Sequence, residues 1–238
     1  MSNLPPAPPT PRREFLGQLA TAAVALAGTA CANTVAATQS ATQAAAPAPR
    51  VPRPPQHFDD AWVKRLTAPH KAVFDSPDIE DGLAIGQAYL YMQGYHTVYQ
   101  TPDSDIQAVI VMRHKGVPMA FGDELWDKYE IGKMIKLKDD KTGKWMRRNP
   151  FYKADPADKN AWPEGTLSAL SARGAILVAC NLAAMGMAGR MAAAVKADAD
   201  AVRDEVRAGL VPGVTLAPSG VFATLRAQEA GCVFLRSS

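Results

Sequence analysis

Apolar and polar positions alternate in two different patterns along the chain. Short runs of aliphatic residues predict strands, and the longer segments between them, with apolar residues every three or four positions, predict helices. The expected strands are 70–75, 106–114, 175–180, 214–218 and 232–236. The expected helices are 81–99, 121–132, 166–174, a small-residue segment after 180, a charged segment ending near 208, and 219–231.

The expected strands are apolar along nearly their whole length, which is typical of strands buried on both faces. Since a helix follows almost every strand, the pattern predicts a three-layer α/β/α sandwich with a mainly parallel sheet of about five strands. In the longest expected helix, the apolar stripe comprises Leu83, Ala84, Ala88, Tyr91, Met92 and Tyr95. In the segment 121–132, the spacing of Leu125, Trp126 and Tyr129 predicts a stripe facing the core rather than a platform for a ligand.

Polar and reactive side chains gather where the expected strands end. Ligands of open parallel sheets bind outside the carboxyl ends of the strands, so this rim is the expected site. The candidates are Asp75 with Ser76, Arg113 with His114, Cys180 with Asn181, and Ser219 in the segment Pro218-Ser219-Gly220. Alternation along a strand sends Arg113 and His114 to opposite faces, and we therefore expect only one of them to face the crevice.

The first thirty residues have the pattern of an export signal. Residues 11–17 read PRREFLG, and an uncharged, alanine-rich run follows to residue 30. This resembles a twin-arginine signal, and the run is too short and too weakly apolar for a membrane span. We expect a signal peptide over 1–32, export through the twin-arginine route and a periplasmic protein. Cleavage at a small-x-small site around Cys31 is favoured, and a lipid on Cys31 is the alternative.

Beyond the signal, the composition divides the chain into a linker and one domain. Residues 33–57 contain Ala, Thr, Gln and Pro with almost no large apolar side chain, so burial cannot compensate the entropy of ordering them. We expect a disordered linker there and a single domain over 58–238. Within this domain, 137–165 is a polar, turn-rich excursion, which we expect to form a lid over the crevice or an interface between subunits.

Charge and motifs exclude several classes of function. The chain of 238 residues has a formal net charge of +3, and its one basic concentration, 133–148, also contains acidic residues, as a solvated loop does. We therefore expect no nucleic-acid partner. The sequence contains no Walker A, GxGxxG, paired-cysteine zinc or GxSxG motif, so it indicates no cofactor and no metal centre of these kinds.

Two segments of the carboxy-terminal half carry a resemblance to a known family. GAILVACNLAAMGM (174–187) and GLVPGVTLAPSGVFATLRAQEAGCVFLR (209–236) are similar to the DsrE/DsrF-like sulfur-relay proteins. The resemblance implies a Rossmann-like fold with an insertion at about 115–165 and homo-oligomers of three or six chains. It also implies that Cys180 accepts a sulfane sulfur as a persulfide and passes it on, with a small sulfur species or a donor or acceptor protein as partner.

The residues around Cys180 support a reactive thiol on their own. The thiolate is the reactive form of cysteine, and a helix N-terminus stabilises it through unpaired N–H groups and the helix dipole. We expect Cys180 at such a position, with His114 or Asp75 affecting its protonation and Asn181, Ser219 and Arg113 contacting the substrate. The structural alternative is a small buried side chain at a strand end, a common role of free cysteine.

Two further hypotheses concern the sulfur atoms. Cys232 begins its expected strand whereas Cys180 ends its own, so parallel strands keep the two apart and we expect no disulfide between them. Cys232 is then a core residue. As an alternative function, the protein is a non-catalytic binding or assembly module, in which Met185 and Met187 beside Cys180, together with His114, hold a soft ion such as Cu(I).

Overall fold

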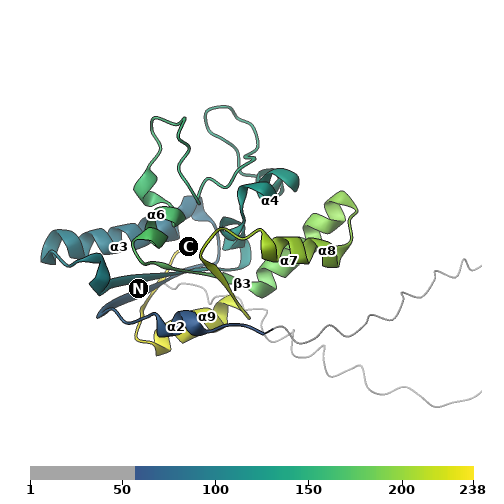
Figure 1. The fold of residues 1–238 in the computed structure, drawn as a ribbon. Helices are drawn as coiled ribbons and strands as arrows, with labels where there is room; N and C mark the ends of the chain where they lie inside the picture. Colours follow the sequence, from purple (N-terminus) through teal and green to yellow (C-terminus); the bar gives the residue numbers. More distant parts are fainter. Residues whose placement is uncertain (1–56) are drawn as a thin grey trace, which may run out of the picture. The chain divides into compact units, whose positions relative to one another are not determined.

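A computed structural model describes residues 57–238, which contain a five-stranded sheet flanked by helices (Figure 1). The expected signal peptide, its cleavage site and most of the expected linker lie outside the described residues. The strands are β1 (His70–Ser76), β2 (Ile106–Met112), β3 (Ile176–Cys180), β4 (Val214–Ala217) and β5 (Val233–Arg236). They follow the order β4-β3-β2-β1-β5, and every neighbouring pair is parallel.

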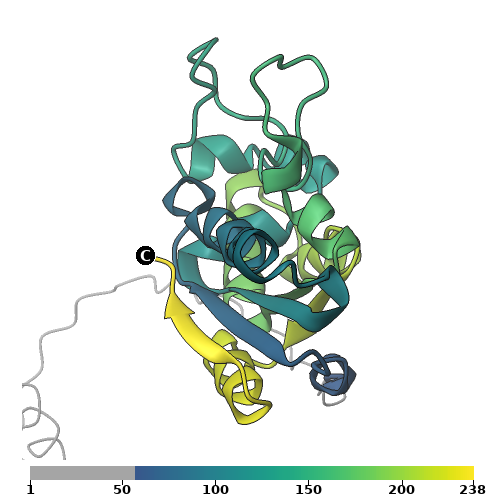
Figure 2. The same cartoon turned by 90° about the vertical axis from the view of Figure 1, so that its left-hand side faces the viewer.

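The helices form a layer on each face of this sheet, so the expected Rossmann-like α/β/α sandwich is confirmed (Figures 1 and 2). One face is covered by α3 (Leu83–Tyr99), α4 (Asp123–Lys128), α5 (Ile131–Met134), α6 (Leu167–Ala172), α7 (Asn181–Val195) and α8 (Ala199–Ala208). The other face is covered by α2 (Ala61–Lys64) and α9 (Gly220–Glu229). Short 3-10 turns lie at Glu80–Gly82, Asp103–Asp105, His114–Ala120 and Pro163–Gly165.

Alternation along the strands divides the buried side chains into two cores. In β1, Phe74 packs into the larger core under α3, while Val73 packs into the smaller core under α9. In β3, Leu177 and Val178 are divided in the same way. Burial on both faces explains why these strands are apolar throughout.

Helix α3 differs from the expectation at its start. Ala84, Ala88 and Met92 are buried as expected, whereas Leu83 is 40% exposed. The helix begins at Leu83 because Glu80 and Asp81 have positive φ angles of 40° and 52°, which a helix does not accommodate. The first turn therefore points Leu83 away from the sheet.

The expected helix over 121–132 is two short helices. It breaks at Glu130, whose φ of 48° is left-handed, so α4 and α5 leave in different directions. This break allows Trp126 and Ile131, both fully buried, to enter the same core. The expected core stripe is confirmed, since Leu125, Trp126 and Tyr129 are at most 4% exposed.

The excursion 137–165 forms two extended loops above the α3 face (Figure 1). Its base is anchored by Asn149, which is fully buried and whose Nδ2 donates to the carbonyl oxygens of Met119 and Phe121, each at 2.8 Å. Among the described helices, none is long and apolar enough to cross a membrane.

Candidate functional site around Cys180

Cys180 is the last residue of β3 and the N-cap of α7. Its φ and ψ of −75° and 111° are those of a strand, and the helix begins at the next residue. The Sγ atom accepts a hydrogen bond from the Ala183 N–H group at 3.4 Å. The thiol therefore faces the positive end of a helix of fifteen residues, and the residue is 7% exposed. The expected capping position is confirmed.

Arg113, the first residue after the neighbouring strand β2, lies beside Cys180. Met112 of β2 is paired with Ala179 of β3, so the next residues of the two chains, Arg113 and Cys180, stand side by side. Residues two positions apart in a strand lie on the same face of the sheet. Arg113 and Cys180 each come two positions after a valine, Val111 or Val178, that packs into the smaller core. Arg113 and Cys180 therefore share the α9 side of the sheet rather than the α3 side.

Arg113 is fixed in place by Asp75 at the carboxyl end of β1. Nε donates to Oδ1 at 2.6 Å and Nη2 donates to Oδ2 at 2.7 Å, a bidentate pair with the 3% exposed Asp75. The hydrogen bond to Asp75 raises the pKa of Arg113, and the negative charges of Asp75 and of a Cys180 thiolate raise it further. The guanidinium is thus a permanent cation within reach of the thiol.

Helix α9 packs against the site on the face of the sheet that carries the smaller core. Ser219 is its N-cap, and the Ser219 hydroxyl accepts from the Phe222 N–H at 3.1 Å. Gly220 lies so close to Arg113 that a Cβ atom there would stand 2.4 Å from the Arg113 Cβ. Thr224, one turn further, donates to the Gly220 carbonyl at 3.0 Å and approaches Asp75 Oδ1 at 3.4 Å. Helices α7 and α9 therefore begin on adjacent strands at the same rim.

Asn181 has a buried polar atom without a partner. Its Oδ1 makes no hydrogen bond to any described residue, although the residue is only 9% exposed and directly follows Cys180. A buried carbonyl oxygen of this kind costs about 1–3 kcal/mol unless a donor reaches it. Native proteins keep few such atoms, and they occur at sites that bind water or a ligand.

His114 lies apart from this cluster. The strand β2 ends at Met112, before the expected end at 114, and His114 has a left-handed φ of 51° that opens the following 3-10 turn. Its side chain is exposed and makes no hydrogen bond or ion pair within residues 57–238. Of the two residues after β2, Arg113 is therefore the one that joins Asp75 and Cys180. A role of His114 in proton transfer stays a prediction.

Met185 and Met187, the methionines of the alternative metal site, pack on the face of the sheet opposite to Cys180. Met187 is 1% exposed and packs into the larger core, and Met185 packs against the same core. Cys180 belongs to the opposite side of the sheet by alternation. In the described part of the chain, no group of three or more His, Cys, Asp or Glu side chains has the arrangement of a metal site.

Cys232 is a core residue of the smaller core. It is 6% exposed and directly precedes β5, at the amino end of the parallel sheet. Strands β2 and β1 lie between β3 and β5, and both Cys180 and Cys232 are free thiols. Burial raises the pKa of Cys232 to about 11, so its thiol is neutral at physiological pH.

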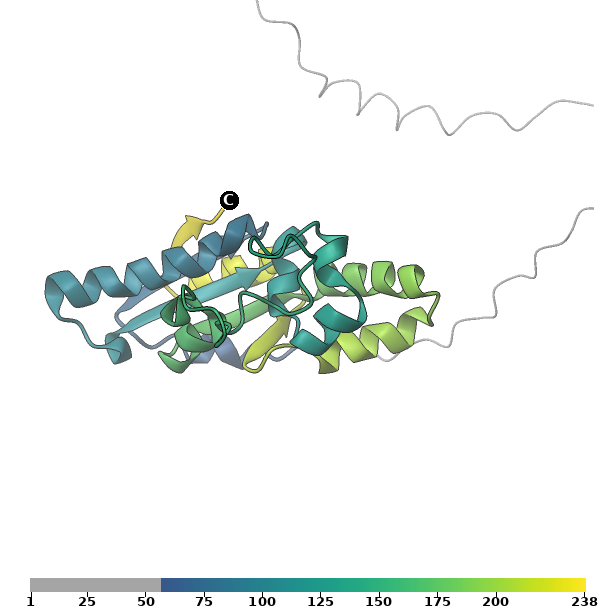
Figure 3. The ribbon, with the colours of Figure 1, turned by 90° about the horizontal axis from the view of Figure 1, so that it is seen from above.

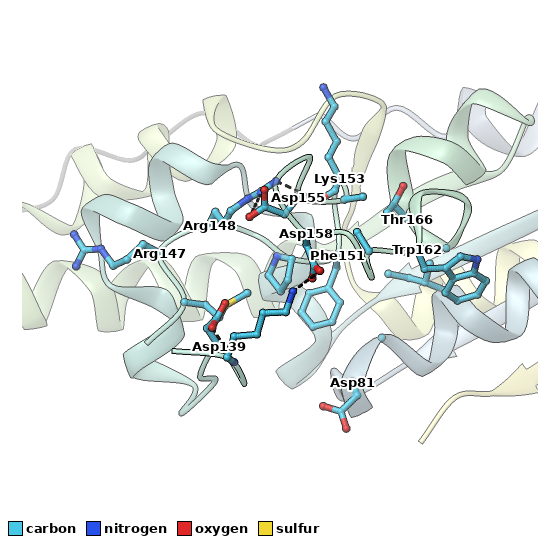
Figure 4. A pocket seen from close by; sticks show the side chains of 18 of the residues that line it. Asp81, Asp139, Arg147, Arg148, Phe151, Lys153, Asp155, Asp158, Trp162 and Thr166 are labelled. Carbon is cyan, nitrogen blue, oxygen red and sulfur yellow. Dashed lines mark hydrogen bonds and ion pairs between the residues drawn. The ribbon is translucent and has the colours of Figure 1, made fainter. Parts of the chain in front are cut away.

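The excursion encloses a separate hollow of about 930 Å³ (Figure 4). Its walls come from the first turn of α3 and from 139–166, and Arg148 joins Asp155 across it at 3.1 Å. Asp75, Arg113 and Cys180 do not line this hollow. The excursion therefore covers the α3 side of the molecule, and the expected lid over Cys180 finds no support in this arrangement.

Two residues of the site were not expected from the sequence. Gly220 and Thr224 support Arg113 and Asp75 from a helix that begins more than a hundred residues after β2. Their spacing of four places both on one face of a helix, and the sequence offers that signal. Only the packing of α9 across β1, β2 and β3 identifies the strands that this face meets.

The sheet and its rim define a Rossmann-like α/β protein with a capped cysteine at the carboxyl ends of the strands. A scan of known family models and a search of curated proteins each find no match to this chain. The functional interpretation therefore rests on the geometry around Cys180 and on the sequence resemblance.

Proposed function

We propose that this protein carries sulfane sulfur as a persulfide on Cys180 and hands it to an acceptor. The observation that carries the proposal is the position of the Cys180 Sγ, which accepts the Ala183 N–H at the start of α7 and lies beside Arg113. A helix N-terminus and a fixed cation both favour a thiolate over a thiol. The resemblance of 174–187 and 209–236 to DsrE/DsrF-like proteins supports the same chemistry, and the PRREFLG segment supports a periplasmic location.

The transfer needs no external oxidant or reductant. The Cys180 thiolate attacks the outer sulfur of a donor persulfide, one S–S bond breaks in the donor, one forms on Cys180, and the donor leaves as a thiolate. With thiosulfate as donor, the leaving group is sulfite. The product on Cys180 is again an anion, so the N–H groups of α7 and the charge of Arg113 stabilise both states of the carrier.

The neighbouring residues have distinct roles in this proposal. Arg113 stabilises negative charge at the sulfur, and Asp75 is a positioning residue because both of its oxygens are occupied by Arg113. The free oxygen of the Asn181 amide accepts a hydrogen bond only from a donor, such as a water molecule or a protonated sulfur species. Ser219 fixes the start of α9 against the site.

Intact-mass spectrometry of the protein after incubation with polysulfide or thiosulfate tests the proposal. In a Cys31→Ser background, which leaves Cys180 and Cys232 as the cysteines of the sequence, we expect a gain of whole sulfur atoms that Cys180→Ala abolishes and that Cys232→Ala retains. The Cys232 variant is a matched control because it removes a buried thiol of the same domain. Mass gain that survives Cys180→Ala, or no gain on the reduced wild-type protein, would overturn the proposal.

The binding-module hypothesis predicts a different result. A soft-metal site would retain roughly one copper ion per chain after purification with Cu(I), and Cys180→Ala would lower that amount. Because Met187 packs into the larger core away from Cys180, no observation favours this alternative.

A further inference from the structure

Two side chains of β5 are exposed on the face of the sheet that carries the larger core. Helix α3 packs over β2 and β1, and β5, shown in yellow in Figure 2, lies at the outside of the sheet. Val233 is paired with Ala72, which belongs to the larger core, so the Val233 side chain lies on that face. Leu235, two residues further, points the same way. Val233 and Leu235 are nevertheless 72% and 44% exposed.

A hollow of about 650 Å³ lies between α3 and this strand. Seen from above, β5 runs along the flank of α3 (Figure 3). The volume lies within the range of about 300–1,000 Å³ that is typical of sites for small molecules. On this face of the sheet, the side chains that line the hollow are Gln87, Leu90, Tyr91 and Tyr95 of α3, His70, Ala72 and Phe74 of β1, and Val233 and Leu235 of β5.

Aromatic rings form one connected wall of the hollow. The ring centroids of His70 and Tyr95 are 4.3 Å apart, and those of Tyr95 and Tyr91 are 5.3 Å apart. Phe74 continues the series at 5.8 Å from Tyr91. Rings at these distances attract one another, so each ring restrains its neighbours. The wall is therefore formed before any ligand arrives, and a flat aromatic molecule can extend the series.

The hollow offers no opposite charge to an ionic ligand. Lys71 is the only Lys, Arg, Asp or Glu residue in its lining, and alternation turns the Lys71 side chain to the other face of the sheet. Helix α3 has no Asp, Glu, Lys or Arg in its 17 residues, although Leu90 is 65% exposed. A charged ligand would lose hydration here without gaining a partner. The lining therefore favours a neutral occupant.

The aromatic wall nevertheless carries polar groups without partners. The hydroxyls of Tyr91 and Tyr95 make no hydrogen bond to any residue of 57–238. Burial is the first cause of a raised pKa at Tyr91, so this phenol keeps its proton. A protonated phenol donates a hydrogen bond to an oxygen acceptor. The wall thus combines aromatic faces with hydrogen-bond donors.

We propose that this hollow binds a neutral, flat aromatic molecule that carries a carbonyl oxygen. The aromatic wall stacks on the ring system, and the phenols of Tyr91 and Tyr95 donate to the oxygen. A lipid surface fits less well, because the outer edge of β5 would place unpaired main-chain groups in hydrocarbon. The site is separate from the sulfur chemistry, since neither Arg113 nor Cys180 lines the hollow and both lie on the other side of the sheet.

Fluorescence titration of the full chain with Prodan tests the proposal. Prodan is a neutral naphthyl ketone whose emission moves to the blue in apolar surroundings. We expect saturable binding with a Kd of about 100 μM or tighter. Leu90→Glu and Leu235→Glu replace apolar lining by a charge, and the Kd should rise at least about tenfold in each.

Leu225→Glu is the matched control for this titration. Leu225 is 55% exposed on α9, which packs on the other face of the sheet, so the same substitution there should leave the Kd unchanged. Circular dichroism of each variant establishes that the sheet has folded. A blue shift that does not saturate, binding that survives both lining substitutions, or an equal loss in Leu225→Glu overturns the proposal.

A second titration tests the hydrogen bond to the carbonyl group. The double variant Tyr91→Phe with Tyr95→Phe keeps both rings and removes both hydroxyls. Its Kd for Prodan should rise about threefold to tenfold, the effect of one lost hydrogen bond. Its Kd for dimethylaminonaphthalene, which lacks the carbonyl group, should not change. An unchanged Kd for Prodan, or an equal rise for both probes, overturns the assignment of a carbonyl ligand.

Discussion

Arg113 binds Asp75 through two nitrogen atoms, at 2.6 and 2.7 Å, across the carboxyl ends of neighbouring strands. The pair brings together residues 38 positions apart in the sequence. Arg113 also lies beside Cys180. The Asp75–Arg113 ion pair therefore stabilises the carboxyl edge of the sheet and also holds a positive charge near the Cys180 thiol.

Removal of Arg113 should destabilise the protein. Arg113→Met leaves the Asp75 carboxylate buried without its counter-charge, and we expect the free energy of unfolding to fall by about 3 kcal/mol. The double variant Asp75→Leu with Arg113→Met should recover much of this loss, because no charge is left buried. Urea denaturation measures both. Arg226→Met is the control, since its partner Glu229 is exposed and little change is expected. Equal losses in Arg113→Met and Arg226→Met would contradict the prediction.

The two described cysteines should differ in their pH dependence. Burial raises the pKa of Cys232 to about 11, so at pH 8 only about one molecule in a thousand carries a Cys232 thiolate. We expect iodoacetamide to modify Cys180 at pH 8, and to modify Cys232 only as the pH approaches 11. Peptide mapping after alkylation of the folded protein measures this at each residue. Faster modification of Cys232 than of Cys180 at pH 8 would be inconsistent with a reactive Cys180.

Asn181 should be nearly dispensable for stability but not for sulfur transfer. Its Oδ1 has no partner within the described domain, so Asn181→Leu should leave the free energy of unfolding unchanged or raise it by up to about 1–3 kcal/mol, while slowing persulfide formation. Asn149→Leu is the contrasting variant: it removes two hydrogen bonds donated by Nδ2 and should lower stability by about 3 kcal/mol. Thermal denaturation and the rate of mass gain check the two effects. A large loss of stability in Asn181→Leu would assign Asn181 to the core.

Gly220 should be intolerant of a methyl group. A Cβ atom at Gly220 would stand 2.4 Å from that of Arg113, so Gly220→Ala should displace Arg113, weaken its bond to Asp75 and slow the alkylation of Cys180. In Gly189→Ala, the new methyl group meets nothing within 4 Å inside α7, and stability should rise by about 0.5–1 kcal/mol. Unchanged alkylation in Gly220→Ala would mean that Arg113 does not affect the thiol.

The interior of the fold was predictable from the sequence because parallel strands buried on both faces are apolar at every position. Runs such as 106–112 and 176–180 mark such strands; the first ends two residues before the expected position, and the second begins one residue later than expected. His114 was placed in a strand because it follows an unbroken apolar run. Its left-handed backbone depends on the turn that packs Gly116 against Ser76.

The site was predictable in outline and not in its contacts. Asp75, Arg113 and Cys180 each end an apolar run, and the rule for parallel sheets places such residues on one rim. The ion pair between Asp75 and Arg113 could not be predicted, because it depends on which strands are neighbours. Occupation of both Asp75 oxygens changes its expected role from proton transfer to positioning.

The sequence by itself determined which segments form strands, that polar and reactive residues lie near their carboxyl ends and that the cysteine precedes a helix, since these follow from local pattern and from the burial of apolar side chains. The tertiary structure alone decided the order β4-β3-β2-β1-β5, and with it the partners of Arg113 and the exposure of β5. The physical reason is that strand order and edge exposure depend on packing between segments far apart in the chain. The pattern of apolar residues within one segment does not show which other segments it packs against.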